Sequence, residues 1–139
     1  MSIDWTRMIP EAVQKAAEIA AEQDRIRARR DVAIHAGITV EGLFFDTGEV
    51  SQQRILAAAL SAMTDPGYAV QWKLGDRFVR LDAPAILAAA RAIRDHVQAC
   101  FDREAELLAD LAAAQTFDRP SDRPFDPEAG WPGSTPGPL

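Results

Sequence analysis

The alternating stretch at residues 70–82 constrains the fold of this chain more than any other feature. Apolar and polar side chains alternate along it, and the dipeptide Gly75-Asp76 interrupts it near the middle. Alternation around a two-residue loop that begins with glycine predicts a β-hairpin, because glycine adopts positive φ at little steric cost. In this register Trp72 is expected to anchor the core, and Phe78, on the polar face, is the better candidate for a surface contact.

A long helix is predicted directly after the hairpin, from Asp82 to about Gln115. Asp82 is a favourable N-cap, and Pro84 fits the first turn, where no backbone donor is lost. About 33 residues at 1.5 Å each give a length of roughly 50 Å, which exceeds the width of a small domain. Apolar positions follow steps of four and three, as in a heptad seam that is interrupted once, at Glu104. The seam consists of Ile86, Ala90, Ile93, Val97, Cys100, Glu104, Leu107 and Leu111.

A second long helix is predicted near the N-terminus, from about Pro10 to Ile34. Its apolar stripe is thin because alanine fills most of it, so such a helix is marginal alone in water. We expect it to pack against the long C-terminal helix, either of the same chain or of a second copy. Its basic run is bracketed by acidic residues, which predicts intrahelical ion pairs rather than phosphate binding. That run comprises Arg25, Arg27, Arg29 and Arg30.

The residues between the long helices predict a second hairpin and a short helix. The hairpin is expected over residues 38–45, around the dipeptide Glu41-Gly42. Ser51 is expected to N-cap the short helix, which the breaker sequence at residues 65–67 ends.

Together these elements predict an α+β fold in which two short β-hairpins are packed with a short helix. Long N- and C-terminal helices flank this unit, and an irregular Pro-rich C-terminal tail follows it. We expect an N-terminal helical arm at residues 1–36, a small α+β domain ending in the long helix at 37–116, and an extended Pro/Gly-rich tail at 117–139.

The tail differs sharply in composition from the rest of the chain. Its many prolines and glycines exclude helix and central strand. Its aromatic residues are spaced like anchors, and large aromatic side chains dominate the energetics of interfaces. Partner binding is therefore predicted for the tail anchors and for the helix seam. The predicted partner-binding residues are Phe117, Phe125, Trp131, Ile86, Ile93, Val97, Leu107 and Leu111.

Charge and composition disfavour several classes of function. The 139 residues carry 15 Lys and Arg against 21 Asp and Glu, a formal net charge of −6, which argues against sequence-independent nucleic-acid binding. No apolar run approaches the roughly 18 residues needed to cross a bilayer, and the N-terminus lacks the pattern of a signal peptide. The single cysteine excludes an internal disulfide framework and fits synthesis in a reducing cytoplasm.

Few residues could carry chemistry. His96 and Cys100 lie four apart, a spacing that can place two metal ligands on one helical face, but no further His or Cys stands at ligand spacing. Cys100 fits the seam better as a small hydrophobic residue. The carboxylates of the long helix interleave with arginines, as on a solvated surface. We predict no catalytic residue, no metal site and no cofactor.

The order of several sequence blocks resembles a known family. Residues 36–47 read Ala-Gly-Ile-Thr-Val-Glu-Gly-Leu-Phe-Phe-Asp-Thr, residues 51–55 read Ser-Gln-Gln-Arg-Ile, and the Trp72 hairpin then leads into the long helix. Over about residues 30–115 this order resembles a phage-borne family of uncharacterised domains found in tail-fibre and tail-fibre-assembly proteins. The opening Ile3-Asp4-Trp5 also resembles a recurrent start of its prophage-encoded members. The resemblance implies no active-site residues.

The resemblance implies a bacteriophage tail structural component, a tail-tip or tail-fibre adaptor that acts by protein–protein interaction. The expected location is the virion tail, after synthesis in the cytoplasm of the host bacterium. The expected partners are other phage tail proteins and further copies of the chain, with a trimer favoured, and neither nucleic acid nor membrane. A non-virion assembly chaperone for tail fibres is the alternative. A small enzyme is a third hypothesis, which would require a pocket with paired titratable groups.

Overall fold

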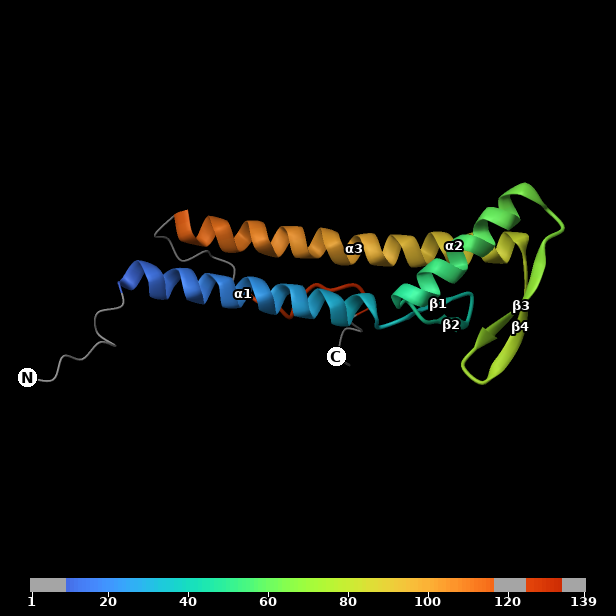
Figure 1. The fold of residues 1–139 in the computed structure, drawn as a ribbon, viewed down its shortest axis with the longest axis horizontal. Helices are drawn as coiled ribbons and strands as arrows, with labels where there is room; N and C mark the ends of the chain where they lie inside the picture. The colour runs from blue at the N-terminus through green and yellow to red at the C-terminus, as the bar shows by residue number, and fades with distance from the viewer. Residues whose placement is uncertain (1–9, 117–124, 134–139) are drawn as a thin grey trace, which may run out of the picture.

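The computed structural model describes residues 10–116 and 125–133, and it confirms the α+β fold (Figure 1). Three helices and two antiparallel hairpins make up these residues. The elements are α1 (Glu11–Ile34), β1 (Ile38–Val40), β2 (Leu43–Phe45), α2 (Glu49–Thr64), β3 (Ala69–Leu74), β4 (Arg77–Asp82) and α3 (Ala83–Thr116). No described helix is both long enough and apolar enough to cross a membrane.

Helix α3 is the axis of the molecule, and the other elements lie along it. Helix α1 packs antiparallel to the C-terminal half of α3, so the predicted partnership of the long helices forms within one chain (Figure 1). Helix α2 crosses the N-terminal half of α3, and the hairpins lie at the same end. The molecule is therefore elongated, with a two-helix arm at one end and a mixed α/β unit at the other.

Both hairpins form with the predicted loops. In the β3–β4 pair Trp72 stands opposite Val79, as predicted, and Gly75 has φ of 60°, which suits the first loop position of a type II′ turn. In the β1–β2 pair Glu41 and Gly42 have φ of 49° and 78°, the pattern of a type I′ turn. Each hairpin is a separate two-stranded sheet, so both need a helix to cover their apolar face.

The predicted start of α3 is confirmed, whereas the predicted start of α2 is wrong. The Asp82 carboxylate accepts a hydrogen bond of 3.0 Å from the Ala85 N–H. Helix α2 begins at Glu49 with Gly48 as N-cap, so Ser51 lies inside its first turn. The helix begins before Ser51 because the Asp46 carboxylate accepts a hydrogen bond from the Gly48 N–H at 2.9 Å. This bond between a side chain and the backbone two residues later forms a local turn.

A buried threonine joins the end of α1 to the start of α2. The Thr47 hydroxyl is fully buried, donates to the Ile34 carbonyl at 2.5 Å and accepts the Gly37 N–H at 2.9 Å. The first bond satisfies the Ile34 carbonyl, which the last turn of α1 leaves free, and the second satisfies the N–H of Gly37, just after the helix. Thr47 thereby fixes the direction in which the chain leaves the arm.

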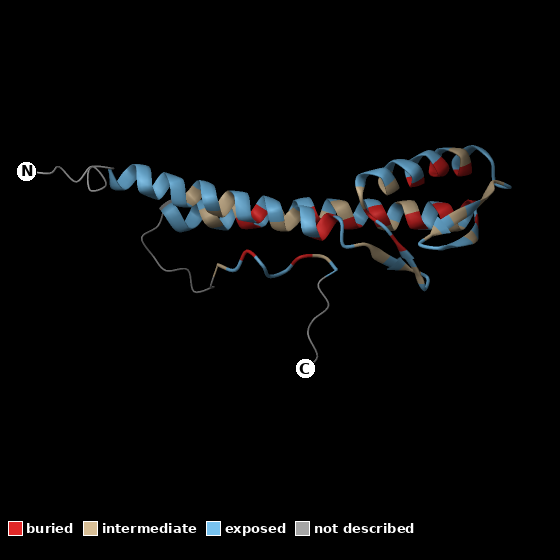
Figure 2. Ribbon diagram, turned by 60° about the horizontal axis from the view of Figure 1, so that its bottom comes forward, coloured by how far each residue is buried: buried red, intermediate tan, exposed pale blue. Residues whose placement is uncertain are grey.

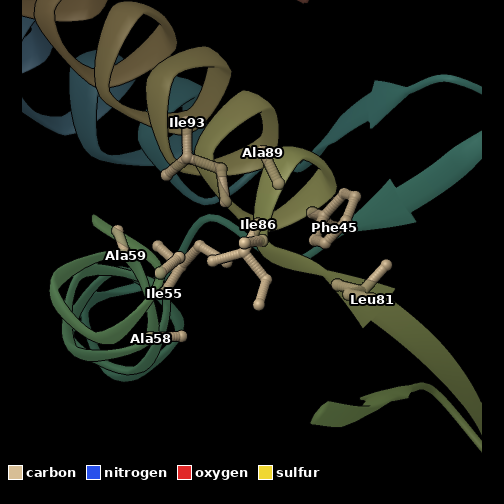
Figure 3. Close-up of a cluster of buried hydrophobic side chains, with 10 residues drawn as sticks. Phe45, Ile55, Ala58, Ala59, Leu81, Ile86, Ala89 and Ile93 are labelled. Atoms are coloured by element: carbon tan, nitrogen blue, oxygen red, sulfur yellow. The ribbon is translucent and has the colours of Figure 1, made fainter. Parts of the chain in front are cut away.

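The main core, here called the hairpin cluster, lies where α2 and α3 cover the hairpins. Ile86 of α3 is fully buried and stands between α2 and the strands (Figure 3). Trp72 is half-buried and packs against this cluster, as predicted for an anchor. The hairpin cluster consists of Phe45, Ile55, Ala58, Ala59, Ala62, Leu81, Ala83, Ile86, Ala89 and Ile93.

A second, smaller core, here called the arm cluster, lies between α1 and α3. Part of the tail, residues 125–133, contributes to it and is here called the C-terminal segment. Buried positions in the arm are sparse along α1 and α3 (Figure 2). The arm cluster consists of Ile26, Ala33, Ile34, Cys100, Leu107 and Trp131.

Candidate partner-binding surface

An open groove of about 1420 Å³ lies between α2 and α3 and is here called the α2–α3 groove. Small-molecule sites usually enclose roughly 300–1,000 Å³ and bury most of their ligand, so this wider surface suits a macromolecule better. Its lining consists of Gln52, Ile55, Leu56, Ala59, Met63, Leu87, Ala88, Ala90, Arg91, Ala92, Ile93, Arg94, Asp95, Val97, Gln98 and Phe101.

Large apolar side chains line the groove while exposed to solvent. Met63 and Leu56 on α2 are 71% and 62% exposed, and Phe101 and Leu87 on α3 are 44% and 38% exposed. Large apolar side chains that lie exposed next to one another often mark a surface that binds another molecule. The groove is therefore the candidate site of protein binding.

Helix α2 has two apolar faces, and the exposed one contributes to the groove. One face, which includes Ile55 and Ala59, enters the hairpin cluster. The other carries Leu56, Leu60 and Met63, which are all exposed. Sequence analysis assigns these residues no surface role and so does not predict the groove. The signal was present, because a helix covered on one side needs only one apolar face.

The charged groups of the groove have no ionic partner among the described residues. Arg91, Arg94 and Asp95 line it, and none of their side chains forms a salt bridge or hydrogen bond within residues 10–116 and 125–133. An ionic contact with another molecule would therefore break no contact seen in this structure.

The arginines of α1 behave in the opposite way, because each one is paired. Arg25 and Arg27 form the predicted intrahelical pairs, with Glu22 at 2.9 Å and with Asp24 at 3.3 Å. Arg29 instead reaches the C-terminal segment, where its Nε lies 2.9 Å from a carboxylate oxygen of Glu128.

Arg30 explains the one interruption of the heptad seam. Its guanidinium pairs with Glu104 across the α1–α3 interface, and the two side chains are only 20% and 16% exposed. It also donates to Asp31 and lies 5.2 Å from the centre of the Phe101 ring. Burial acts to lower the pKa of Arg30, but its bonds to Asp31 and Glu104 outweigh burial and raise the pKa above its ordinary value.

The C-terminal segment docks on the arm through Trp131. This side chain is buried, its Nε1–H donates to the Pro127 carbonyl at 2.7 Å, and the Arg29 guanidinium lies 5.7 Å from the ring centre. Arg103 of α3 donates to the Ala129 carbonyl at 2.9 Å. In this chain the predicted anchor is already held by the arm.

Most residues predicted to bind partners are in contact with other parts of their own chain. Ile86 and Ile93 are buried in the hairpin cluster, and Leu107 is buried in the arm cluster. Half-buried residues packed against the arm cluster are Val97, Leu111 and Phe125. Phe117 lies outside the described residues. Contact of this set with a separate partner stays a prediction.

The pair His96 and Cys100 is built into the arm. His96 Nε2 lies 2.8 Å from the Ala33 carbonyl oxygen and therefore donates to it, and the Cys100 Sγ lies 3.9 Å from the same nitrogen. Burial raises the pKa of the Cys100 thiol, against a smaller lowering by Arg29. Among the described residues no group of three or more His, Cys, Asp or Glu side chains is placed to hold a metal ion.

A second hollow, of about 290 Å³, lies beside the β3–β4 hairpin. Its two titratable lining residues are Asp46 and Lys73, and the Asp46 carboxylate is already bonded to the Gly48 N–H. General acid–base chemistry requires groups positioned against a substrate, and a carboxylate used in a backbone turn is poorly suited to that role.

The comparisons with known proteins give one match. A family model described as "Domain of unknown function (DUF4376)" matches residues 13–126, which include both hairpins, α2, α3 and all of α1 except its first two residues. No curated protein and no solved structure matches the chain.

Proposed function

The chain belongs to the DUF4376 family of domains of unknown function, and we propose that it serves as a structural adaptor in a bacteriophage tail. The phage setting rests on the resemblance of about residues 30–115 to domains of tail-fibre and tail-fibre-assembly proteins. The role as an adaptor rests on the surface of the fold. In this proposal the chain works by holding other proteins, at the tail tip or at the base of a fibre.

The α2–α3 groove is the observation that carries the proposal. It exposes Leu56, Met63, Leu87 and Phe101 beside charged side chains that have no ionic partner within residues 10–116 and 125–133. Large apolar side chains with a polar rim form the usual anatomy of a protein interface. A chain that acts by assembly would need such a surface.

Exposed aromatic side chains of the two hairpins offer further candidate contacts outside the groove. Phe44 of β2 and Phe78 of β4 are both exposed. Sequence analysis favours Phe78 for a surface contact, and this side chain is 63% exposed. An adaptor needs at least two such surfaces, one for each neighbour that it joins.

Quantitative mass spectrometry of purified particles tests the proposal. The sample is the phage or induced prophage that encodes the chain, and the expected result is a few copies of the chain per particle. A Leu56→Glu/Met63→Glu variant should be lost from particles. A Val32→Glu variant is the matched control, because Val32 is 63% exposed on α1 and outside the groove. It should be incorporated normally.

Absence of the wild-type chain from particles, with abundant chain in the infected lysate, would overturn the structural role. If the chain in that lysate were bound to fibre protein, the alternative of an assembly chaperone would replace it.

A further inference from the structure

We propose that the arm is a binding site for a short peptide, that the C-terminal segment is the peptide it recognises, and that the segment of one copy can bind the arm of another. The contacts that carry this inference involve none of the residues that line the α2–α3 groove. The inference therefore goes beyond the proposed function and does not depend on it.

The C-terminal segment is shaped as a turn by its own hydrogen bonds. The Asp126 carboxylate accepts the Glu128 N–H at 2.9 Å, and the Asp126 carbonyl accepts the Ala129 N–H at 3.3 Å. The Trp131 Nε1–H donates to the Pro127 carbonyl at 2.7 Å. A ligand whose shape is fixed by its own bonds loses less conformational entropy on binding. The segment is therefore organised as a ligand that docks as one unit.

Both helices of the arm hold this turn. On α1, the Arg29 Nε lies 2.9 Å from a carboxylate oxygen of Glu128, and the Arg29 guanidinium lies 5.7 Å from the centre of the Trp131 ring. On α3, the Arg103 Nε donates to the Ala129 carbonyl at 2.9 Å. Trp131 itself is 3% exposed and belongs to the arm cluster. Buried tryptophan and arginine side chains are the residues that most often dominate the binding energy of an interface.

Gly130 makes the site selective for the sequence of the peptide. Its φ of 80° lies in the left-handed region, which favours glycine. A Cβ atom at this position would lie 2.8 Å from the Arg103 Nε. Arg103 is not free to move away, because it is bonded to the Ala129 carbonyl and to the Glu106 carboxylate. The arm therefore selects a peptide of the form Glu-x-Gly-Trp.

The connection to α3 is long enough for the segment to reach a second copy. Eight residues, 117–124, separate the end of α3 at Thr116 from Phe125. A fully extended connection of this length spans up to about 30 Å, at about 3.3–3.6 Å per residue. Two packed helices are about 20 Å wide, so the arm of a neighbouring copy lies within that reach. The short connection gives the segment an effective concentration of about 1 mM at its own arm, which favours binding within one chain.

Fluorescence anisotropy of a labelled peptide added to the full chain tests the site. The peptide consists of residues 125–133 with blocked ends. A Trp131→Ala chain removes the anchor of its own segment and should bind the peptide with a dissociation constant of about 10 µM. The wild-type chain should bind it about a hundredfold more weakly, because its own segment competes at about 1 mM. Peptides that carry Trp131→Ala or Gly130→Ala should bind the Trp131→Ala chain at least tenfold more weakly than the unmodified peptide.

Charge reversal tests whether the free peptide occupies the position of the segment. Adding Arg29→Glu to the Trp131→Ala chain should weaken binding at least tenfold, and a Glu128→Arg peptide should restore it. Arg27→Glu in the same chain is the matched control. Arg27 pairs with Asp24, and residues two apart on a helix point about 200° away from each other. This control should leave the affinity for the peptide unchanged.

Sedimentation velocity of two full-length variants tests exchange between copies. An Arg29→Glu/Arg103→Ala chain keeps its segment but lacks an intact site, whereas the Trp131→Ala chain keeps the site but lacks the anchor. At about 100 µM of each, the mixture should contain a one-to-one complex that neither variant forms alone. Absence of that complex would overturn the proposed binding between copies.

Circular dichroism checks that each variant is folded. If loss of Trp131 unfolds the chain, a Glu128→Arg/Gly130→Val chain replaces it, because these changes weaken docking of the segment and leave Trp131 in place. The peptide site is overturned if a folded variant of this kind does not bind the peptide, or if binding is indifferent to Trp131 and Gly130 of the peptide. Failure of the Glu128→Arg peptide to restore binding to the Arg29→Glu chain would also overturn it. None of these results depends on the copy number in particles, so the proposed function is tested separately.

Discussion

The hairpin cluster and the arm cluster show two ways of holding a long helix in place. The hairpin cluster gathers aliphatic and aromatic side chains from α2, α3 and both hairpins, and its contacts are almost wholly apolar. The arm cluster is smaller and is bordered by directed polar contacts, notably Arg30 with Glu104 and His96 with the Ala33 carbonyl. The N-terminal half of α3 is thus held mainly by apolar packing. Its C-terminal half is held by a smaller apolar core together with a few paired polar groups.

The comparison explains how so charged a helix as α1 can dock. Burying apolar area yields about 25 cal/mol per Å², and the alanines of α1 offer little area. Polar contacts add little net stability each, but an unmatched buried group is costly. The arm therefore gains selectivity for one register of α1 on α3 more than it gains stability.

Alanine in place of one buried aliphatic residue of each cluster should show the clearest difference between the two clusters. Ile86 and Leu107 are at most 1% exposed. Large-to-small changes of this kind cost about 2–5 kcal/mol, depending on how closely the site is packed. We expect Ile86→Ala to cost about 4 kcal/mol and Leu107→Ala about 2 kcal/mol. Urea unfolding followed by circular dichroism measures both values, and an equal or larger cost at Leu107 would contradict the comparison.

Loss of Trp131 should loosen the arm alone. The Trp131→Ala variant should cost about 3 kcal/mol, the lower end for a buried tryptophan, because the C-terminal segment covers the arm on one side only. Hydrogen exchange should quicken along α1 and the C-terminal half of α3, while the hairpin cluster keeps its protection. Phe125→Ala is the control, since Phe125 is only half-buried and should have a smaller effect. Loss of protection in α2 would show that the two clusters are not separate.

Removing one partner of the Arg30–Glu104 pair should cost more than replacing both. The Arg30→Ala variant strands the largely buried Glu104 and should cost about 2 kcal/mol. The double variant R30L/E104L completes the apolar seam and should lie within about 1 kcal/mol of the wild type. Arg25→Ala, which breaks an exposed pair, should cost at most about 0.5 kcal/mol. If the double variant were as unstable as the single one, the pair would contribute stability rather than register.

The alkylation rate of the Cys100 thiol should report local opening of the arm in the unmodified chain. It is fully buried and its pKa is raised, so few thiolates are accessible in the folded chain. Alkylation by iodoacetamide at pH 8 should be about a hundredfold slower in buffer than in urea. Leu107→Ala should speed it through local opening of the arm. A native rate close to that of the unfolded chain would mean that the arm is mostly open.

Features set by short-range chemistry could be predicted from the sequence. The loop at Gly75 fixed the register of the β3–β4 hairpin, and Asp82 capped α3 as expected. The start of α2 could not be predicted in the same way. Ser51 is a good N-cap by type, but the bond from the Gly48 N–H to Asp46 starts the helix earlier. Which of the two residues, Gly48 or Ser51, becomes the N-cap depends on the path by which the chain enters the turn.

Tertiary packing explains why the candidate site was not predicted. The heptad seam of α3 was identified correctly, but the periodicity of one helix does not say which surface covers it. In the structure α1 and α2 of the same chain cover the seam at Ile86, Ile93 and Leu107. The exposed apolar surface is a neighbouring stripe, which includes Leu87 and Phe101. That stripe carries arginines at its centre, so a search for uninterrupted apolar periodicity passes over it.

The antiparallel pairing of α1 with α3 has a consequence for the way the chain is made. Ile26 and Leu107 both belong to the arm cluster, yet the ribosome makes Leu107 about 80 residues after Ile26. At about 5–20 residues per second the interval is roughly 4–16 s. During that time α1 has left the ribosome and its docking surface does not yet exist. A strongly apolar arm would invite aggregation in this interval. The charged, alanine-rich helix therefore suits the nascent chain as well as the folded protein.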